Sequence, residues 1–555
     1  MLRLSLVALA TVSALAPLAP AQVFDERFDD WPVRHRIGGV VAVAGSLDDV
    51  RALGDARLRL DEDARVLLLL EKGVDEPRVR QYRELLAGDD DSGRTLDVVR
   101  YGDSLPDDLV ARLADCDALC WESVGAESRI GVPALAGVRD ALAGLVDRGG
   151  LVLAVGPGAR FLGHSHRTGD GPEAPVAPGL DLVPDTVIDT TYRGAEDRGE
   201  LLGVLAPRQR LVGVGLAPGT ALVLDRRRCR VVGKGTAEFL LMANDRQPVR
   251  AQTITPQRER RQSPKEYLVD LTEWRRDAID RTLEPFPPAE PYAPVVENGT
   301  LLIVGGGGLP DGLIDRFIEL AGGTEEARLV YVPCSERGDV GASQRTVEGW
   351  KQRGVKNATF IHTKDRLRAN TDEEILGPLR GATGIWFGGG RQWNFADSYY
   401  GTEAHRLMKD VLRRGGVIGG SSAGASIQGR YLARATPIQN FEIMAPGYER
   451  GGLGFLGGVA IDQHFTQRGR QKDMTQLVDR YPQLLGIGID ETTALVVTKS
   501  RARVVGKGRV CFYDRRLPVV PGELDHVALP AGSEFDLVAR QVTVDTRGAA
   551  RGDGD

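Results

Sequence analysis

The sequence is poor in cysteine, and this shortage excludes a disulfide-built scaffold. Five cysteines in 555 residues are too few for one, and their odd number leaves at least one unpaired. Cys116 and Cys120 resemble a pair, but we expect a strand at 118–121. Strand residues four apart lie about 13 Å from each other, beyond the reach of a disulfide.

The sequence also lacks the usual signatures of metal and nucleotide sites. It has seven histidines, no HExxH motif and no Cys/His cluster at ligand spacing, so we expect no metal site. The isolated His362, His405 and His526 are expected to serve surface or packing roles. Its central glycine-rich stretch has neither the lysine of a phosphate-binding loop nor a GxGxxG turn. We therefore expect no cofactor.

The sequence also has no large excess of positive or negative charge. The formal net charge is −6, from 71 basic and 77 acidic residues that are well mixed along the chain. No basic surface for nucleic acid is therefore expected.

Long apolar runs are absent beyond the first residues. Residues 1–21 combine Arg3, a short apolar core and the small-residue pattern Ala19-Pro20-Ala21, as in a secretory signal peptide. A membrane anchor needs about 20 apolar residues, and prolines interrupt this segment. We expect cleavage near Ala21, export to the periplasm or the medium, and no membrane span.

The most informative stretch present is Val417–Ser426, in which small residues surround a serine pair after a short apolar run. It is typical of a strand, a sharp turn and a helix start that together expose one hydroxyl. The amide of Ala423 would then point at a developing oxyanion. Ser421 is the competing nucleophile, and a close-packed strand–helix crossing without chemistry is the simpler interpretation.

Two later segments favour the nucleophile. His464 follows a strand-like run at 459–462, and the acids Asp490 and Glu491 follow another at 486–489. A serine, a histidine and an acid at successive strand ends form the arrangement that activates a hydroxyl. Either acid could orient the imidazole.

These segments together closely resemble the cyanophycinase family of serine peptidases, whose relatives include the aspartyl dipeptidases. The resemblance covers about Asn298 to Tyr513 and has its motifs in the family's order. The further motifs are the strand Leu301–Val304 with Gly305–Gly308, the segment 332–336, and the loop Gly388–Gln392.

The resemblance implies roles for the site residues. Ser422 would be the nucleophile, His464 the general base and Glu491 the group that orients the imidazole, with Asp490 as the alternative. The oxyanion hole would be formed by the amide of Ala423 and by the loop amides of Gly389 and Gly390.

The resemblance also implies a pocket for an aspartate-containing peptide or polymer. Its lining would be Gln392, Asp462, Gln463, Arg468 and Arg470. Arginines suit carboxylates because a guanidinium can bind them through two hydrogen bonds, although a solvated basic loop is an equal alternative. Arg391 replaces a common acid and Asp473 replaces an arginine of cyanophycin-degrading members, which weakens the case for cyanophycin itself.

The predicted fold class is α/β. Apolar strand-like runs alternate with helical stretches, which predicts a mostly parallel, doubly wound sheet with helices on both faces. This matches the class I glutamine amidotransferase-like or flavodoxin-like fold that the resemblance implies. Ligands of such sheets bind at the carboxyl ends of the strands, where these motifs fall.

The N-terminal half is predicted to be a degenerate, inactive copy of the same domain. Residues 232–235 and 505–508 both have the sequence VGKG, and further short segments match in order between the halves. In this alignment Gly156 replaces Ser422, Thr191 replaces His464 and Pro218 replaces Glu491. The copy could form an intrachain pseudo-dimer, and a homodimer is the alternative.

The expected domains follow from these segments. They are a signal peptide at 1–21, the degenerate copy at 22–247, a helix and proline-rich linker at 248–297, the catalytic domain at 298–515, and a β segment with a tail at 516–555. A helix is expected to begin at Ser263-Pro264.

Two other functions remain open. A glutaminase or another acyl-transfer enzyme could use this fold, although an amidotransferase would normally place cysteine at the turn. A non-catalytic binding protein is the second alternative, which the complete Ser, His and Glu set argues against.

Overall fold

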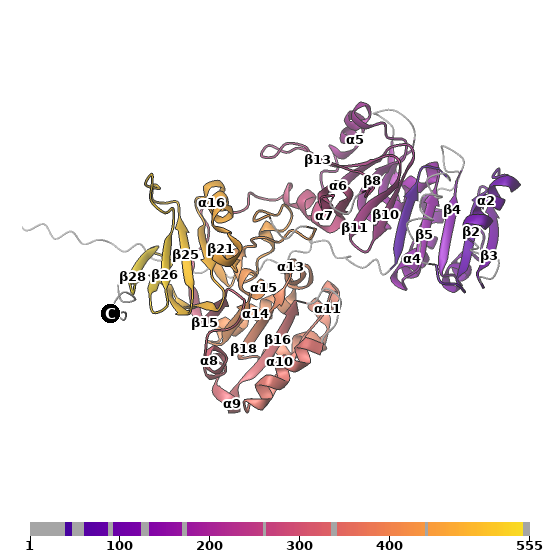
Figure 1. Ribbon diagram of the computed structural model, residues 1–555. Coiled ribbons are helices and arrows are strands. Elements are labelled where there is room, and N and C mark those ends of the chain that lie inside the picture. The colour runs from indigo at the N-terminus through magenta and orange to yellow at the C-terminus, as the bar shows by residue number, and fades with distance from the viewer. Residues whose placement is uncertain are drawn as a thin grey trace, which may run out of the picture.

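The computed structural model describes residues 39–46, 60–86, 93–123, 132–168, 175–258, 262–334, 341–438 and 442–547. The expected signal peptide lies outside these ranges. Two lobes follow each other along the chain, the N-terminal one indigo to magenta and the C-terminal one salmon to yellow (Figure 1). Among the described residues, no helix is both long enough and apolar enough to cross a membrane.

The C-terminal lobe is built on a nine-stranded sheet in the order β17-β16-β18-β19-β15-β23-β24-β27-β28. The first five of these strands pair in parallel. They are β15 (Val296–Val304), β16 (Arg328–Cys334), β17 (Asn357–Phe360), β18 (Gly384–Gly390) and β19 (Val417–Ser421). An antiparallel extension begins with β23 (Thr493–Lys499) and β24 (Arg501–Gly506).

Helices cover both faces of this sheet, because alternate residues of β15 enter two different cores. Leu301 and Ile303 pack in the core that holds α12 (Glu373–Gly381) and α14 (Glu403–Arg413). Leu302 and Val304 pack in the core of α8 (Leu313–Leu320) and α10 (Gly341–Gln352). The predicted α/β class with a mostly parallel, two-sided sheet is confirmed.

A second sheet completes this lobe, in the order β20-β21-β22-β25-β26. Its strands are β20 (Gly429–Tyr431), β21 (Leu456–Gln463), β22 (Leu485–Ile489), β25 (Arg509–Asp514) and β26 (Val527–Pro530). The predicted C-terminal β segment is therefore not separate. Strand β26 belongs to this sheet, while β27 (Glu534–Asp536) and β28 (Gln541–Val544) extend the larger one.

The N-terminal lobe repeats this strand order. Its larger sheet runs β3-β2-β4-β5-β1-β10-β11-β14, with parallel pairing up to β1 and antiparallel pairing after it. These strands are β1 (Val40–Ala44), β2 (Arg65–Glu71), β3 (Thr95–Tyr101), β4 (Ala118–Glu122), β5 (Leu151–Val155), β10 (Thr220–Asp225), β11 (Arg228–Gly233) and β14 (Leu268–Asp270).

The smaller N-terminal sheet runs β13-β12-β9-β8-β6-β7, which follows the order of its counterpart and adds β7 at one edge. Its strands are β6 (Gly163–Arg167), β7 (Val176–Pro178), β8 (Val183–Asp189), β9 (Val212–Leu216), β12 (Ala237–Leu241) and β13 (Arg250–Ile254). All five cysteines, Cys116 and Cys120 among them, are free and buried.

Two glycines, Gly488 and Gly215, make the same kind of contact in the two halves and show which residues of the halves correspond. A β-carbon on Gly488 would lie 2.4 Å from the ring of Phe465, and one on Gly215 would lie 2.4 Å from the ring of Tyr192. Each strand therefore needs glycine where an aromatic side chain crosses it. Because Phe465 follows His464 and Tyr192 follows Thr191, these two positions correspond.

Two sequence-based boundaries differ from the structure. Strands β13 and β14 lie beyond residue 247 but complete the N-terminal sheets, and Leu271, Trp274 and Ala278 pack in the core of the same lobe. The helix expected from Ser263 is a single turn, α6 (Pro264–Tyr267), and Ser263 makes no side-chain cap. Pairing of β14 with β11 interrupts the helix, which begins again as α7 (Leu271–Asp280) with Asp270 as its cap.

Candidate active site

Ser422 lies on a sharp turn between β19 and the short helix α15 (Ala423–Ser426). Its φ of 57° and ψ of −112° are unusual for a residue with a side chain, a conformation that costs on the order of 1–3 kcal/mol. Small neighbours make the turn feasible. A β-carbon on Gly420 would lie 2.3 Å from the carbonyl oxygen of Gly424. The predicted strand, turn and helix start are present.

His464 faces this serine. Its Nε2 lies 2.9 Å from Oγ of Ser422. The residue follows β21 with a φ of 49°, and its amide donates to the carbonyl of Gly305. The Gly305–Gly308 run makes room for the ring, since a β-carbon on Gly306 would lie 2.4 Å from Cε1 of His464.

Glu491, rather than Asp490, reaches the imidazole. Oε1 of Glu491 lies 2.6 Å from Nδ1 of His464. Asp490 is buried and accepts hydrogen bonds from Thr466 and from the amide of Arg509, so it holds two loops together. Of the two acids that the sequence left open, the structure brings only Glu491 against the ring.

The surroundings of His464 favour its neutral form. Burial lowers the pKa of the imidazole below its ordinary value. The hydrogen bond with Glu491 opposes this shift, and the positive charge of Arg468 adds to it. A neutral imidazole at physiological pH can accept a proton from a neighbouring hydroxyl.

Three backbone amides are the expected oxyanion donors. Ala423 is the first residue of α15, so its amide has no carbonyl partner one turn earlier. Gly389 and Gly390 are exposed at the end of β18, beyond its last pair with β19. A β-carbon on Gly389 would lie 3.5 Å from Cβ of Ser422. Of the three, Ala423 follows Ser422 directly and Gly389 approaches its β-carbon, while Gly390 pairs with Cys334.

Four of the five predicted pocket residues are buried, namely Gln392, Asp462, Gln463 and Arg470. Asp462 pairs with Arg470 at 2.9 Å, and Arg470 also donates to the carbonyl of Gln463. Gln392 donates to the carbonyl of Ala433 at 2.9 Å. Asp462 and Arg470 are thus engaged with each other and Gln392 with a backbone carbonyl, and the lining of a pocket by these side chains stays a prediction.

Arg468 differs from these four. It is exposed, and it lies close enough to His464 for its charge to influence that imidazole. Within the described ranges no hydrogen bond or ion pair of its guanidinium was found. Arg391 is exposed as well, with its guanidinium 5.7 Å from the ring centre of Trp393.

Arg434 is a member of this network that the sequence did not identify. It is buried, has a φ of 58°, and pairs with Asp462 at 2.9 Å and with Asp473 at 2.7 Å. The negative charge of Asp473 is therefore balanced within the protein. No motif marks Arg434, which lies in an irregular segment 28 residues before Asp462.

The corresponding site of the N-terminal half is changed in its backbone as well as its side chains. Gly156 stands at the turn, and the next residue is Pro157, which has no amide hydrogen to stabilise an oxyanion. The amide of Gly158 donates to Oγ of Ser123 at 2.6 Å. Thr191, at the histidine position, bonds to Asp189.

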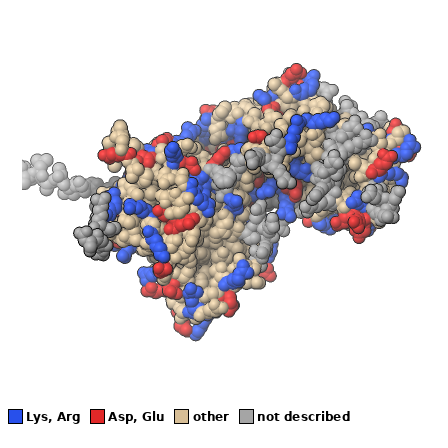
Figure 2. Space-filling view, viewed as in Figure 1, with Lys and Arg blue, Asp and Glu red and all other residues tan. Residues whose placement is uncertain are grey.

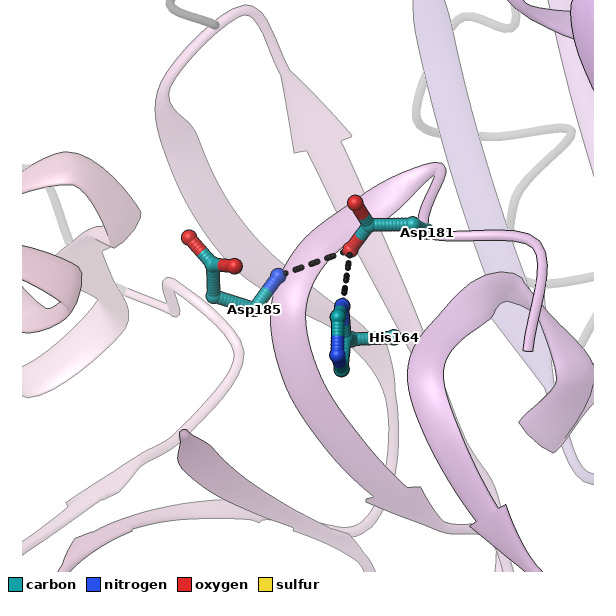
Figure 3. Close-up of side chains that lie close together, drawn as sticks. All are labelled: His164, Asp181 and Asp185. Carbon is teal, nitrogen blue, oxygen red and sulfur yellow. Dashed lines mark hydrogen bonds and ion pairs between the residues drawn. The ribbon is translucent and has the colours of Figure 1, made fainter. Parts of the chain in front are cut away.

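The same half contains a group with metal-ligand chemistry, formed by His164, Asp181 and Asp185, whose ligand atoms lie within 4.8 Å of one another. The sequence did not indicate it. Figure 3 shows Asp181 accepting hydrogen bonds from His164 and from the amide of Asp185. Arg139 pairs with Asp181 and Arg275 with Asp185, so cationic side chains already balance both carboxylates.

Charges on the molecular surface are mixed. Figure 2 shows basic and acidic side chains interspersed over both lobes on the face in view. This agrees with the small net charge of −6.

Comparison with known proteins finds similarities to the C-terminal half. Residues 301–505 match the model of Peptidase family S51. A cyanophycinase of Geminocystis herdmanii is 29% identical over 209 residues, which cover 36% of this chain and 74% of that protein. A cyanophycinase of Synechococcus elongatus is 29% identical over 211 residues, covering 37% of this chain and 63% of that protein.

Two solved structures align with nearly their whole length. A peptidase from an acI-B1 actinobacterium is 24% identical, with 43% of this chain and 97% of that chain covered and a TM-score of 0.33. A putative peptidase E protein of Listeria monocytogenes is 14% identical, with 38% and 98% covered and a TM-score of 0.28.

Proposed function

We propose that the protein is a serine-type peptidase in which Ser422, His464 and Glu491 form the catalytic triad. The match of residues 301–505 to the model of Peptidase family S51 and the similarity to cyanophycinases support this proposal. The observation that carries the proposal is the continuous contact from Oγ to Nε2 at 2.9 Å and from Nδ1 to Oε1 at 2.6 Å.

The reaction would begin with attack of the Ser422 hydroxyl oxygen on the scissile carbonyl, while Nε2 of His464 takes the hydroxyl proton. The carbonyl oxygen becomes negative and is stabilised by the amides of Ala423 and of Gly389 or Gly390. Collapse of this intermediate breaks the carbon–nitrogen bond, and His464 delivers the proton to the leaving amine. A water activated by His464 then hydrolyses the acyl-enzyme.

Glu491 would keep the imidazole in the tautomer that presents a free Nε2 to the serine. The hydrogen bond at Nδ1 also stabilises the imidazolium that forms when the serine proton is taken. Asp490 instead holds the loop that carries Glu491 in place, by accepting hydrogen bonds from the amides of Thr466 and Arg509.

We propose an aspartyl-type peptide as the substrate, with Arg468 binding a carboxylate beside the attacked bond. Support comes from its exposure and from its proximity to His464. In a β-linked aspartyl peptide the free α-carboxylate lies next to the side-chain amide that is cleaved. Arg470 supports this pocket indirectly, because Asp462 already takes its charge.

Short isoaspartyl or acidic peptides are favoured over cyanophycin in this proposal. Both relatives named above are cyanophycinases. In this chain Asp473 occupies a position where an arginine would offer a further basic contact, and it also takes up the charge of Arg434. The additional carboxylates of a polymeric substrate would therefore gain less binding energy in this site.

The N-terminal half is proposed to be an inactive copy of the catalytic half, and the chain to be exported. Equal strand order supports the first proposal, together with Gly156 and Pro157 at the turn. The signal-peptide pattern of residues 1–21 supports the second.

The deciding experiment is a screen of aspartyl peptides in which products are identified by mass spectrometry, with Ser422→Ala as the control. Cleavage at aspartyl bonds that is lost in Ser422→Ala supports the proposal. Equal rates on neutral α-peptides without aspartate would contradict the substrate class.

A further inference from the structure

Asp397, a buried carboxylate of the catalytic half, forms ion pairs across the contact between the two halves. Asp397 lies on α13 (Trp393–Tyr399) and is buried at the contact between the lobes. Two arginines from outside the catalytic half form ion pairs with it, Arg227 with Oδ2 and Arg276 with Oδ1. The hydroxyl of Tyr448 donates to Oδ1 at 2.8 Å.

The two arginines are themselves held in place. Arg227, in the turn between β10 and β11, also pairs with both carboxylate oxygens of Asp270. Arg276 lies on α7, is fully buried, and has its guanidinium 4.6 Å from the ring centre of Tyr448. Both arginines therefore present a fixed charge to the catalytic half.

The backbones also approach closely at this contact. Gly447 has a φ of 80°, and a β-carbon there would lie 2.5 Å from the carbonyl oxygen of Glu273 on α7. Only glycine allows the segment before Tyr448 to reach the helix. Figure 1 shows α7 next to the region of α13, between the two lobes.

Asp397 is a short distance along the chain from the proposed oxyanion loop. Helix α13 follows the Gly389–Gln392 segment directly, with Gln392 as its cap residue. Gln392 in turn donates to the carbonyl of Arg434 at 2.6 Å. Helix α13 therefore leads from the proposed oxyanion loop to the contact with the N-terminal half.

Charge makes this coupling strong. A buried carboxylate is stable only when its partners are in place. Within the catalytic half, Arg366 donates to the backbone carbonyl of Asp397 at 3.5 Å and Tyr448 donates to its carboxylate. Arg227 and Arg276 bring two cationic side chains to the same carboxylate from outside the catalytic half, so loss of either removes a charged partner from a buried group of α13.

We propose that Arg227 and Arg276 are positioning residues for peptide hydrolysis, which act through Asp397 to hold the Gly389–Gln392 segment against Ser422. The proposal rests on the proposed triad and oxyanion loop. It gives the N-terminal half a role in the reaction although that half has no nucleophile of its own.

The test uses the full chain and a fluorophosphonate probe, which reacts with an activated serine and needs the oxyanion hole but no peptide pocket. In Arg227→Met the rate constant for labelling Ser422, and kcat per titrated site, should fall roughly 10- to 100-fold, the size expected when a reacting group shifts by about 1 Å. KM should change little, because only transition-state contacts are lost. Arg227→Lys should recover part of the rate.

A double-mutant cycle tests the route through Asp397. Arg227→Met combined with Asp397→Asn should be no slower than the slower single variant, because both remove one interaction. Lys265→Met is the matched control. It breaks an exposed ion pair with Glu442 at the same interface, and its labelling rate should equal that of the wild type.

Labelling of Arg227→Met at the wild-type rate, with a lowered unfolding temperature, would show a purely structural contact and overturn the proposal. If Arg227→Met does not fold, wild-type rates in both Arg227→Lys and Asp397→Asn overturn it equally. A wild-type protein that is labelled but cleaves no aspartyl peptide refutes the proposed substrate alone. Absence of labelling at Ser422 refutes the triad, and with it this proposal.

Discussion

Gly307 lies directly against Glu491. A β-carbon on Gly307 would stand 2.5 Å from Cδ of that carboxylate, while Oε1 of the same carboxylate lies 2.6 Å from Nδ1 of His464. The glycine run after β15 thus sets where the acid can stand, and the acid sets where the imidazole stands. Gly306 has the same relation to the imidazole itself.

The first prediction concerns this fit. Gly307→Ala should lower kcat roughly 100-fold, because displacing a catalytic group by about 1 Å has that effect. Gly312→Ala is the matched control, since Gly312 also has a positive φ, 71° against 67°, but nothing lies within 4 Å of its added β-carbon. Equal kcat values for the two variants would mean that Gly307 is needed only for its positive φ and not for its close approach to Glu491.

The second prediction concerns the triad. Ser422→Ala and His464→Ala should each reduce turnover by orders of magnitude, and Glu491→Gln should do so less, because the three act as a unit. Steady-state kinetics on an aspartyl peptide measures this. Ser421→Ala should remain active, and loss of activity in Ser421→Ala but not Ser422→Ala would shift the nucleophile by one residue.

Asp490→Asn distinguishes the two acids. The neutral side chain loses part of its hydrogen bonding with the Thr466 and Arg509 segments, so stability should fall more than kcat. A loss of kcat larger than that of Glu491→Gln would reassign the orienting acid.

The third prediction concerns pH. His464 must be neutral to accept the serine proton, and burial lowers its pKa, so activity should persist below the ordinary histidine value of about 6.5. Glu491→Gln removes a hydrogen bond that raises this pKa, so the acid limb of the kcat/KM profile should move to lower pH. Arg468→Gln removes a positive charge that lowers it and should move the limb to higher pH.

The fourth prediction separates two neighbouring arginines. Arg468→Gln should raise KM for aspartyl peptides roughly 10- to 100-fold, the worth of one charged hydrogen bond, with an unchanged unfolding temperature. Arg470→Gln should instead lower the free energy of unfolding by about 1–3 kcal/mol, because Asp462 loses one of its two buried arginine partners and keeps Arg434. The reverse pattern would exchange their roles.

The fifth prediction concerns the N-terminal copy. Gly156→Ser introduced into Ser422→Ala should not restore hydrolysis, because Pro157 removes the oxyanion amide and Thr191 cannot act as a base. Any hydrolysis that this double variant performs would contradict the assignment of that half as inactive.

The sequence predicted the α/β class and the order of the site motifs because both depend on local patterns. A serine between small residues and a histidine after an apolar run are visible without a structure. The choice between Asp490 and Glu491 could not be made from the sequence, because the side chains of adjacent residues at a strand end point in different directions that the sequence does not reveal. The glycine run was recognised as a motif, but its role needs the positions of His464 and Glu491.

Long-range contacts account for what the sequence did not predict. Arg434 meets Asp462 across 28 residues, and Arg227 meets Asp397 across 170. Charged residues are common in this chain, so nothing local marks these two pairings. The helix expected from Ser263 failed for a related reason, since pairing of β14 with β11 outweighs the local capping signal.

The most direct test of the account is to map the residue that a fluorophosphonate modifies in the full-length protein, by peptide mass spectrometry. The account predicts a single adduct on Ser422, absent from Ser422→Ala and formed far more slowly in His464→Ala. An adduct on Ser421, an unmodified protein, or labelling that persists at the full rate without His464 would contradict it.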